Sequence, residues 1–163
     1  MFRKLFLVML MLMNGDRRAS YLKRIGYFGA QGDNCYFQPY NFGTEPKLIY
    51  FGNNVNVASQ VMFINHDITY ALFNKMEKNS NSPYKKRIGK IVIGNNVFIG
   101  ARTTILYDVK IGNNVIIGAG SLVNKDIPDG CVAAGVPAKV VGSFQKFGPS
   151  ATHPDGDVPC VCK

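Results

Sequence analysis

Large aliphatic and aromatic residues recur at every sixth position through much of this chain. The longest series consists of Ile93, Ile99, Ile105, Ile111, Ile117 and Val123. Two positions before each of these stands a small or β-branched residue: Ile91, Val97, Thr103, Val109, Val115 and Ser121. A period of six matches neither the 3.6 of a helix nor the two of a single strand. It does match a short strand followed by a corner, repeated along the chain.

Three strands and three corners close a coil of 18 residues, and stacked coils align their strands in parallel. An earlier block, Ile49–Phe63, keeps the same spacing, and Gln31-Gly32 with Cys35-x-Phe37 resembles a degenerate opening turn. Gly-Asn-Asn recurs at 52–54, 94–96 and 112–114, as expected where a corner needs the left-handed conformation. The strands of an ordinary sandwich would not keep unbroken hexads. We therefore predict an all-β domain, a parallel β-helix of hexapeptide repeats, over residues 27–142.

The repeat is interrupted once. Counting on from Phe63, the next coil should begin at residue 69, but the pattern resumes only at Ile93. The excess equals the length of the stretch 67–90, which is polar and has no hexads. Long loops in compact domains are usually functional or disordered. We predict an extended active-site loop here, whose basic cluster is either a solvated face or a guide for anionic groups: Lys75, Lys78, Lys85, Lys86, Arg87 and Lys90.

Residues 1–26 form a separate apolar segment. Arg3 and Lys4 precede the apolar run 5–13, which resembles the start of a signal peptide but is followed by no small-x-small cleavage site. Nine residues are too few to cross a bilayer, which needs about 20. Asp16 is a candidate N-cap for a short helix through Ile25, with Tyr21, Leu22 and Ile25 on one side. The prediction is a short N-terminal helix packed on the domain, or a membrane-surface contact through residues 1–13.

Charge and cysteine content narrow the partners. The net charge of +9 suits phosphate-bearing ligands, anionic glycans, nucleic acid or a membrane surface. Because no nucleic-acid-binding motif accompanies it, we predict no nucleic-acid partner. Cys160 and Cys162 lie in the tail 143–163 and fit no zinc spacing, while Cys35 and Cys131 are predicted to be buried. This reduced inventory indicates a cytoplasmic protein, peripheral to the membrane if residues 1–13 touch it.

Only two histidines are available for chemistry. His153 lies in the unpatterned tail and is assigned no role, whereas His66 stands where the coil ends and the long loop begins. A zinc-dependent carbonic anhydrase built on such a coil needs three histidine ligands, so that function is excluded. We predict that no metal is required.

The surroundings of His66 carry a specific resemblance. Three motifs are involved: Asn65-His66-Asp67 before the long loop, the stretch 93–101 (IGNNVFIGA), and the stretch 117–128 (IGAGSLVNKDIP) continued by AGVPAK at 134–139. Over residues 42–141 the chain resembles the maltose, galactoside, capsule and xenobiotic O-acetyltransferases of the hexapeptide-repeat acyltransferase superfamily. The resemblance implies a left-handed coil and a homotrimer with its sites between subunits.

The resemblance also implies roles for three residues near the reaction. His66 matches the general base that takes the proton of an acceptor hydroxyl, and imidazole, with an unperturbed pKa of about 6.5, suits this task. Asp67 is a candidate both to orient the ring and to contact the substrate. The backbone N–H of Ala101 matches the group that faces the thioester oxygen and stabilises the oxyanion.

Other matched positions concern the donor and the acceptor. Ala119, Asn124 and Lys125 match the stretch that lines the pantetheine arm of acetyl-coenzyme A. Lys125 and Lys139 match basic positions near the phosphates, where lysine acts as a point charge. Asn41 is a candidate acceptor-sugar contact, although the repeat slips by two residues between Phe37 and Phe51.

The predicted function is therefore direct transfer of an acetyl group from acetyl-coenzyme A to a sugar or polysaccharide hydroxyl, within a ternary complex whose acceptor partner is a small molecule or a glycan. Two alternatives stay open from the sequence. One is N-acetylation of an amino sugar or an antibiotic. The other is a non-catalytic β-helix that acts as a binding or assembly subunit, because a fold does not determine a function.

Overall fold

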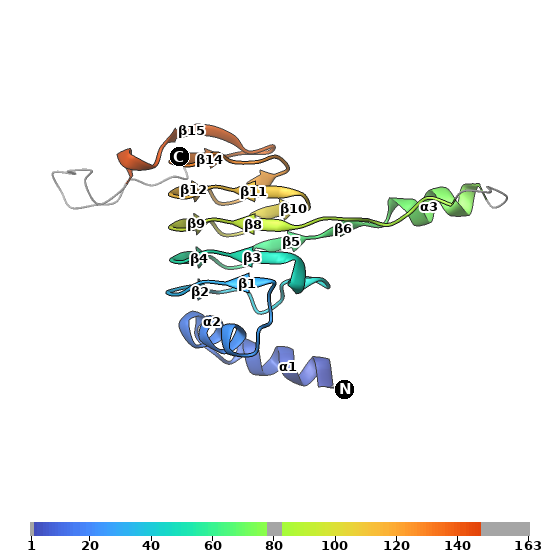
Figure 1. Ribbon diagram of the computed structural model, residues 1–163, viewed down its shortest axis with the longest axis horizontal. Helices are drawn as coiled ribbons and strands as arrows, with labels where there is room; N and C mark the ends of the chain where they lie inside the picture. Colours follow the sequence, from blue (N-terminus) through green and yellow to red (C-terminus); the bar gives the residue numbers. More distant parts are fainter. Residues whose placement is uncertain (1, 78–82, 148–163) are drawn as a thin grey trace.

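The computed structural model describes residues 2–77 and 83–147, and this part of the chain is mostly β (Figure 1). The described strands form three parallel sheets and one antiparallel pair. The first sheet contains β1 (Ala30–Gln31), β3 (Ile49–Phe51), β8 (Ile91–Ile93) and β11 (Val109–Ile111). The second contains β2 (Tyr36–Phe37), β4 (Val55–Val57), β9 (Val97–Ile99), β12 (Val115–Ile117) and β14 (Cys131–Ala134), with β15 (Lys139–Ser143) added antiparallel at its edge. The third contains β5 (Met62–Ile64), β10 (Thr104–Leu106) and β13 (Leu122–Val123).

The chain visits the three sheets in turn, so its strands stack as successive coils (Figure 1). Paired residues in neighbouring coils are 18 positions apart, as Val97 and Val115 illustrate. Across the interruption the offset is 42, as between Val55 and Val97. This exceeds one coil of 18 by 24 residues, which is the length of the stretch 67–90 and confirms the predicted interruption. The first coil is longer, with an offset of 20 between Ala30 and Tyr50. This confirms the two-residue slip before Phe51.

The hexad residues fill the interior of the coil. All twelve positions of the long series are buried. The six corresponding positions of the earlier block are buried as well: Ile49, Phe51, Val55, Val57, Val61 and Phe63. The two polar members, Thr103 and Ser121, both donate their hydroxyl to the carbonyl of Gly118 (3.2 and 2.6 Å). Each buried aliphatic side chain contributes about 1.5–3 kcal/mol to stability. Cys35 and Cys131 are buried as well, as predicted.

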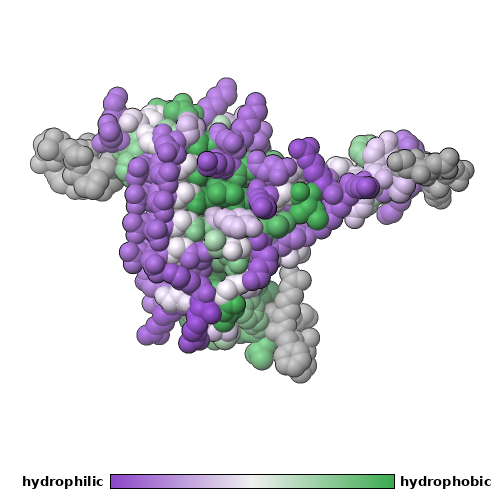
Figure 2. All heavy atoms as spheres, in the orientation of Figure 1, coloured by the Kyte–Doolittle hydropathy of each residue, from purple (hydrophilic) through white to green (hydrophobic). Residues whose placement is uncertain are grey.

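The Gly-Asn-Asn corners stack on one another. The left-handed residue is the second asparagine, with φ of 56° at Asn96 and 54° at Asn114. The glycine is needed for another reason, since a Cβ on Gly94 would lie 2.7 Å from the carbonyl oxygen of Gly112. Side chains form a ladder along the corner, for example Asn96 Nδ2 to Asn114 Oδ1 at 2.9 Å. Figure 2 shows hydrophilic side chains in columns along the coil, as such repeated corners require.

Two helices, α1 (Phe2–Met11) and α2 (Gly15–Arg24), cover the N-terminal end of the coil (Figure 1). The predicted cap was wrong: Asn14, not Asp16, caps α2, accepting from the N–H of Arg17 at 2.9 Å. Leu22 is buried, but Ile25 lies past the last turn and is exposed. No helix among the described residues is long and apolar enough to cross a membrane.

Arg18 ties these helices to the coil. Its buried guanidinium donates to backbone carbonyls of α1, of the α1–α2 connection and of the first coil: Leu10, Met13, Phe37 and Gln38, at 2.5–2.8 Å. The positive charge of Arg18 therefore holds α1 and α2 against the coil and is not available to a binding partner.

The stretch 67–90 is not the irregular loop that the sequence predicted. It begins with β6 (His66–Asp67), continues into α3 (Thr69–Met76) and returns through β7 (Arg87–Ile88), which pairs antiparallel with β6 (Figure 1). Asn65 and Gly89 close its base, because the Gly89 N–H donates to the Asn65 carbonyl (2.8 Å) and Asn65 Nδ2 donates to the Gly89 carbonyl (3.2 Å). We call residues 65–90 the excursion. Lys78 and residues 79–82 lie outside the described part.

Two short 3-10 helices complete the fold. η1 (Pro46–Leu48) lies in the connection between β2 and β3, and η2 (Phe144–Lys146) follows β15. The last coil is shortened, since Ile116 pairs with Val132 at an offset of 16. The remaining tail, with His153, Cys160 and Cys162, lies outside the described residues.

Candidate active site

The two insertions into the six-residue repeat meet at one corner of the coil. One is the β2–β3 connection, which holds the two extra residues of the first coil, and the other is the excursion. Phe42 of the connection stacks on Phe63 of β5, with ring centroids 5.7 Å apart. A few residues further along each segment, Glu45 Oε2 lies 2.8 Å from His66 Nδ1. The long-range packing thus brings a carboxylate to the predicted base.

The electrostatics of this pair define the state of the imidazole. Burial tends to raise the pKa of Glu45, but hydrogen bonds from Lys86 (Nζ to Oε1, 2.8 Å), Thr44 and His66 outweigh it and lower the pKa to about 2. The carboxylate is therefore ionised at neutral pH and can only accept. In the neutral imidazole, His66 Nδ1 must then carry the proton, and Nε2 keeps the lone pair.

His66 is accessible to a substrate. Its side chain is 24% exposed, and no hydrogen-bond partner for Nε2 is present among the described residues. A partly exposed ring that is held at Nδ1 and has no described partner at Nε2 is what general-base chemistry needs.

Asp67 does not orient the ring, and that expectation was wrong. Its Oδ1 accepts from the N–H and hydroxyl of Thr69 (3.1 and 2.6 Å), and its Oδ2 accepts from the Tyr107 hydroxyl (2.9 Å). Those hydrogen bonds lower the pKa of Asp67, with the bond from the Thr69 hydroxyl the largest cause. The carboxylate joins the start of α3 to the next coil and holds β6 in place. Its predicted contact with a substrate stays a prediction.

Ala101 and Ala119 occupy equivalent corners of successive coils, between the second and third sheets. The N–H of Gly120 donates to the carbonyl of Ala101 at 2.8 Å. Within residues 2–77 and 83–147, the backbone N–H of Ala101 and that of Ala119 have no acceptor. At the Gly-Asn-Asn corner, by contrast, the matching N–H of Asn95 donates to Asn113 Oδ1 (2.9 Å). The corner at Ala101 thus offers a free amide of the kind that an oxyanion site requires.

The remaining donor positions lie on the last coils and are exposed. Asn124 and Lys125 follow β13 at the corner where His66 stands two coils earlier. Lys139 begins β15, directly after Ala138, whose N–H donates to the Leu122 carbonyl at 2.8 Å. Lys125 thus follows β13 in the chain, and Lys139 follows a residue that is hydrogen-bonded to β13.

His66 and Ala101 are not brought together within one chain. Ala101 lies beside Ser59, because the N–H of Arg102 donates to the Ser59 carbonyl (3.0 Å). From Ser59 the chain runs through β5 to His66, seven residues that span up to roughly 20 Å at about 3.3 Å per residue. The two groups thus stand at opposite ends of the third sheet.

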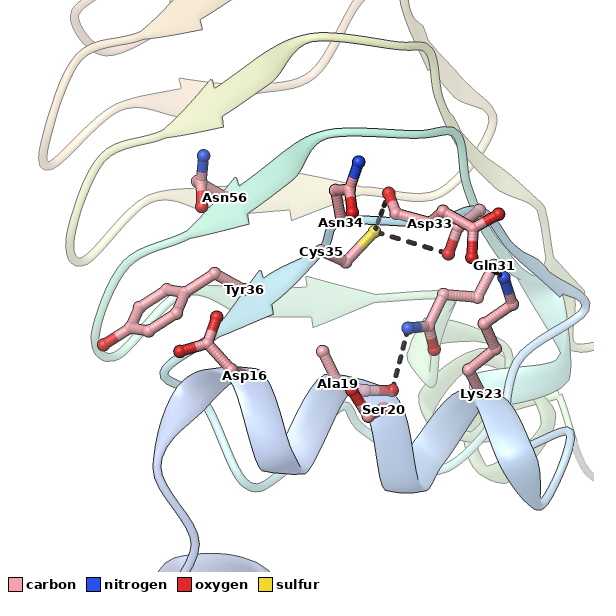
Figure 3. A pocket seen from close by; sticks show the side chains of 11 residues that line it. Asp16, Ala19, Ser20, Lys23, Gln31, Asp33, Asn34, Cys35, Tyr36 and Asn56 are labelled. Carbon is pink, nitrogen blue, oxygen red and sulfur yellow. Dashed lines mark hydrogen bonds and ion pairs between the residues drawn. The ribbon is translucent and has the colours of Figure 1, made fainter.

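Other expected contacts are scattered. Asn41 is exposed in the β2–β3 connection, and its Oδ1 accepts from the N–H of Gly43 (3.1 Å). The basic cluster of the excursion is not one face: Lys86 binds Glu45, Arg87 lies over the Tyr107 ring, and Lys90 lies over the Tyr50 ring. The pocket drawn in Figure 3, about 490 Å³ between α2 and the first coil, contains none of the predicted site residues.

Comparisons with known proteins agree with this geometry. Residues 90–125 match the family described as bacterial transferase hexapeptide (six repeats). Protein CapG of Staphylococcus aureus is 40% identical over 148 residues, covering 89% of this chain and 80% of CapG. Galactoside O-acetyltransferase of Lactococcus lactis subsp. lactis (strain IL1403) is 34% identical over 145 residues, covering 77% and 67%. A solved structure of galactoside acetyltransferase in complex with coenzyme A superposes with a TM-score of 0.57 at 27% identity, covering 88% of this chain and 79% of that one.

A coil of stacked six-residue repeats with an accessible imidazole at one corner defines a class of transferases. The chain belongs to the hexapeptide-repeat acyltransferase superfamily, and it is an acyltransferase.

Glu45, Tyr107 and the contact of Lys86 with Glu45 were not predicted from the sequence. Their roles depend on contacts between segments 21 to 41 positions apart, which no local motif encodes. One signal was present: the two-residue slip before Phe51 marked the connection that carries Glu45. That slip was used only to weigh Asn41.

Proposed function

We propose that the protein is an acetyl-coenzyme A-dependent O-acetyltransferase that acts on a hydroxyl of a sugar or polysaccharide, with His66 as the general base. The observation that carries the proposal is the contact between Glu45 and His66, which leaves a lone pair on an accessible Nε2. The donor is supported by the solved relative at 27% identity that binds coenzyme A. The acceptor class is supported by the relatives named as galactoside O-acetyltransferases.

The reaction is a direct transfer. The acceptor hydroxyl gives its proton to His66 Nε2 while its oxygen attacks the thioester carbonyl carbon. The resulting oxyanion accepts a hydrogen bond from the Ala101 N–H. As the carbonyl re-forms, the carbon–sulfur bond breaks, and the departing thiolate takes the proton from the imidazolium. Glu45 stabilises that imidazolium in between, because it is a carboxylate at hydrogen-bond distance from Nδ1. Neither a metal nor a nucleophilic cysteine takes part.

The site lies between subunits of a homotrimer of left-handed coils. Reacting groups must come within about 3–3.5 Å, and one chain holds His66 and Ala101 at opposite ends of the third sheet. The outer side of that sheet offers a surface for a neighbour, since it carries four apolar residues that are not fully buried: Met62, Ile64, Leu106 and Leu122. His66 of one subunit would then meet Ala101 of the next. Lys125 and Lys139 would bind the phosphates of the donor.

The proposal is tested by acetyl-coenzyme A turnover, read as release of free thiol, with a panel of sugars, oligosaccharides, amino sugars and antibiotics. We expect acceptor-dependent release with at least one sugar or oligosaccharide, and an O-acetyl ester in the product by mass spectrometry. Turnover only with amines would replace the proposal by N-acetylation. Absence of turnover across the panel, together with no coenzyme A binding by calorimetry, would favour a non-catalytic subunit. Light scattering should report a trimer, and a fully active monomer of about 18 kDa would overturn the inter-subunit site.

A further inference from the structure

Helix α1 is apolar on both of its sides, and only one side is covered. Leu10 is completely buried, and Phe6, Met9 and Met13 pack against the core. The opposite side carries the exposed apolar residues Leu5 (69%), Val8 (53%) and Met11 (62%), and Leu12 (84%) continues it in the turn that follows α1. Both sets follow the three- and four-residue spacing that defines a helix face. A helix that is hydrophobic all round is normally covered all round, so the outer face of α1 lacks a partner.

The surroundings of this face are basic. The segment 1–26 contains six lysine or arginine residues and one acidic residue, although Arg18 is buried and Lys23 pairs with Asp33. Arg3 and Lys4 lie in the first turn of α1. Arg17 and Arg24 are exposed on α2, where they line a shallow hollow of about 530 Å³ whose other lining residues are Met13, Asp16, Ser20 and Tyr21.

One of these cations, Arg24, lies close to α1. The Arg24 guanidinium lies 5.3 Å from the centre of the Tyr21 ring, and that ring lies 6.4 Å from the ring of Phe6 in α1. Arg24 therefore sits beside the helix and not at a remote point of the surface. An exposed apolar face bordered by cations matches a surface that is apolar inside and anionic outside.

Charge separates the two candidate partners. A second copy of α1 and α2 would bring Arg17 and Arg24 against identical cations, which repel them. An anionic lipid surface attracts them, with a gain of about 1 kcal/mol for each basic residue near the membrane. We propose that the outer face of α1, with Arg17 and Arg24 of α2, binds the surface of an anionic lipid bilayer.

The geometry suits a helix lying in the interface. Ten residues make α1 about 15 Å long, half of the hydrocarbon thickness of about 30 Å. Its outer residues would enter the boundary between headgroups and acyl chains. Because α1 lies at the N-terminal end of the coil, the coil would rise from the membrane with the excursion pointing to one side (Figure 1). This binding does not depend on the acetyl-transfer reaction.

The test is co-sedimentation of the full chain with two kinds of vesicle, phosphatidylcholine alone and two parts phosphatidylcholine to one part phosphatidylglycerol. We expect binding to the anionic vesicles, at least tenfold weaker binding to the neutral ones, and weakening by high salt. Leu5→Ser with Leu12→Ser should reduce anionic-vesicle binding at least tenfold, and Arg17→Glu with Arg24→Glu should do the same. Leu72→Ser in α3 is the matched control, because Leu72 is also an exposed helical leucine (58%) and should bind as the wild type does.

A second readout uses the absence of tryptophan from the chain. Leu12→Trp introduces a single reporter on the outer face, and its emission should shift to the blue with anionic vesicles only. Circular dichroism melting verifies that each variant is folded. Acetyl transfer to a soluble acceptor should stay at the wild-type level in Leu5→Ser with Leu12→Ser, so failure here is distinct from failure of the proposed function.

Three results would overturn the proposal. They are equal vesicle binding by the serine pair and the control, equal binding to neutral and anionic vesicles, and no binding at all. If sedimentation velocity then shows self-association that the serine pair abolishes, a second copy of the chain covers α1 instead.

Discussion

The stacked coils and the corner at His66 obey different rules. In the coils the strand pairings repeat from one coil to the next, and the same inward positions are filled by isoleucine or valine again and again. At the corner, the contacts among Glu45, His66 and Lys86 have no copy elsewhere in the described chain. The repeated part provides rigidity, and the unrepeated part holds the groups that can do chemistry.

This contrast predicts which property a substitution should change in each region. A core isoleucine touches neighbours in the coils on either side, so its loss is felt as stability. His66 stands outside the stacked core at the base of the excursion, so its loss should be felt in turnover. Substitutions in the two regions can therefore be compared by measuring stability and turnover together.

The largest effect is expected for His66→Ala. General-base assistance contributes about 10²- to 10⁴-fold, so kcat should fall by that factor. The melting temperature should stay within a few degrees of the wild type, because the ring fills no core position and its loss opens no internal cavity. Steady-state kinetics and thermal unfolding on one preparation measure both. A marked drop in melting temperature with near-normal kcat would instead make His66 a structural residue.

In the coil, Ile105→Ala should do the reverse. Ile105 is fully buried, and truncating such a residue costs about 2–5 kcal/mol. Denaturant unfolding should report this loss, while kcat per folded molecule stays close to that of the wild type. Phe98→Ala, at a 45% exposed position of β9 in another sheet, is the control and should cost much less stability. An Ile105→Ala enzyme that loses kcat without losing stability would break the division between the two regions.

At the corner, Glu45→Gln should reveal a pH-dependent contribution to stability. The folded pKa of Glu45 is lowered to about 2, below the unfolded value of about 4.3. Its stabilisation is therefore fully present above about pH 4.3 and lost as the pH falls through about 2. Because the pair is partly exposed, we expect about 1 kcal/mol at pH 7. Unfolding of wild type and variant at pH 7, 4 and 2.5 should show a difference that shrinks with acid, and a constant difference would contradict this.

The smallest effects are expected at the donor lysines. Lys125→Ala and Lys139→Ala should each raise the KM for acetyl-coenzyme A by up to about fivefold, or 1 kcal/mol, with little change in kcat. Each would touch a phosphate remote from the reacting carbon, so ground and transition states lose the same interaction. High salt should reduce the difference from wild type. An unchanged KM in both variants would show that the phosphates bind elsewhere.

The extent of sequence-based prediction follows the same division. The inward residues, the coil length and the length of the interruption could be predicted because the repeat is local and leaves its period in the sequence. The α3 helix within the excursion could not, since its eight residues carry no hexad and only a weak amphipathic pattern. Asp67 was favoured as the partner of His66 because it is adjacent in sequence. In the fold the partner is Glu45, 21 residues earlier, brought there by packing of the phenylalanine pair Phe42 and Phe63.

The central claim is that Glu45 and His66 act as one unit at the corner. A double-variant cycle on kcat tests it most directly, with Glu45→Ala, His66→Ala and both together. Glu45→Ala alone should lower kcat about tenfold or more, because the imidazole loses the group that fixes its tautomer and stabilises its charge. The double variant should be no slower than His66→Ala, since Glu45 has no imidazole left to act on. If the two reductions in kcat multiply instead, Glu45 does not act through His66, which would contradict their action as one unit.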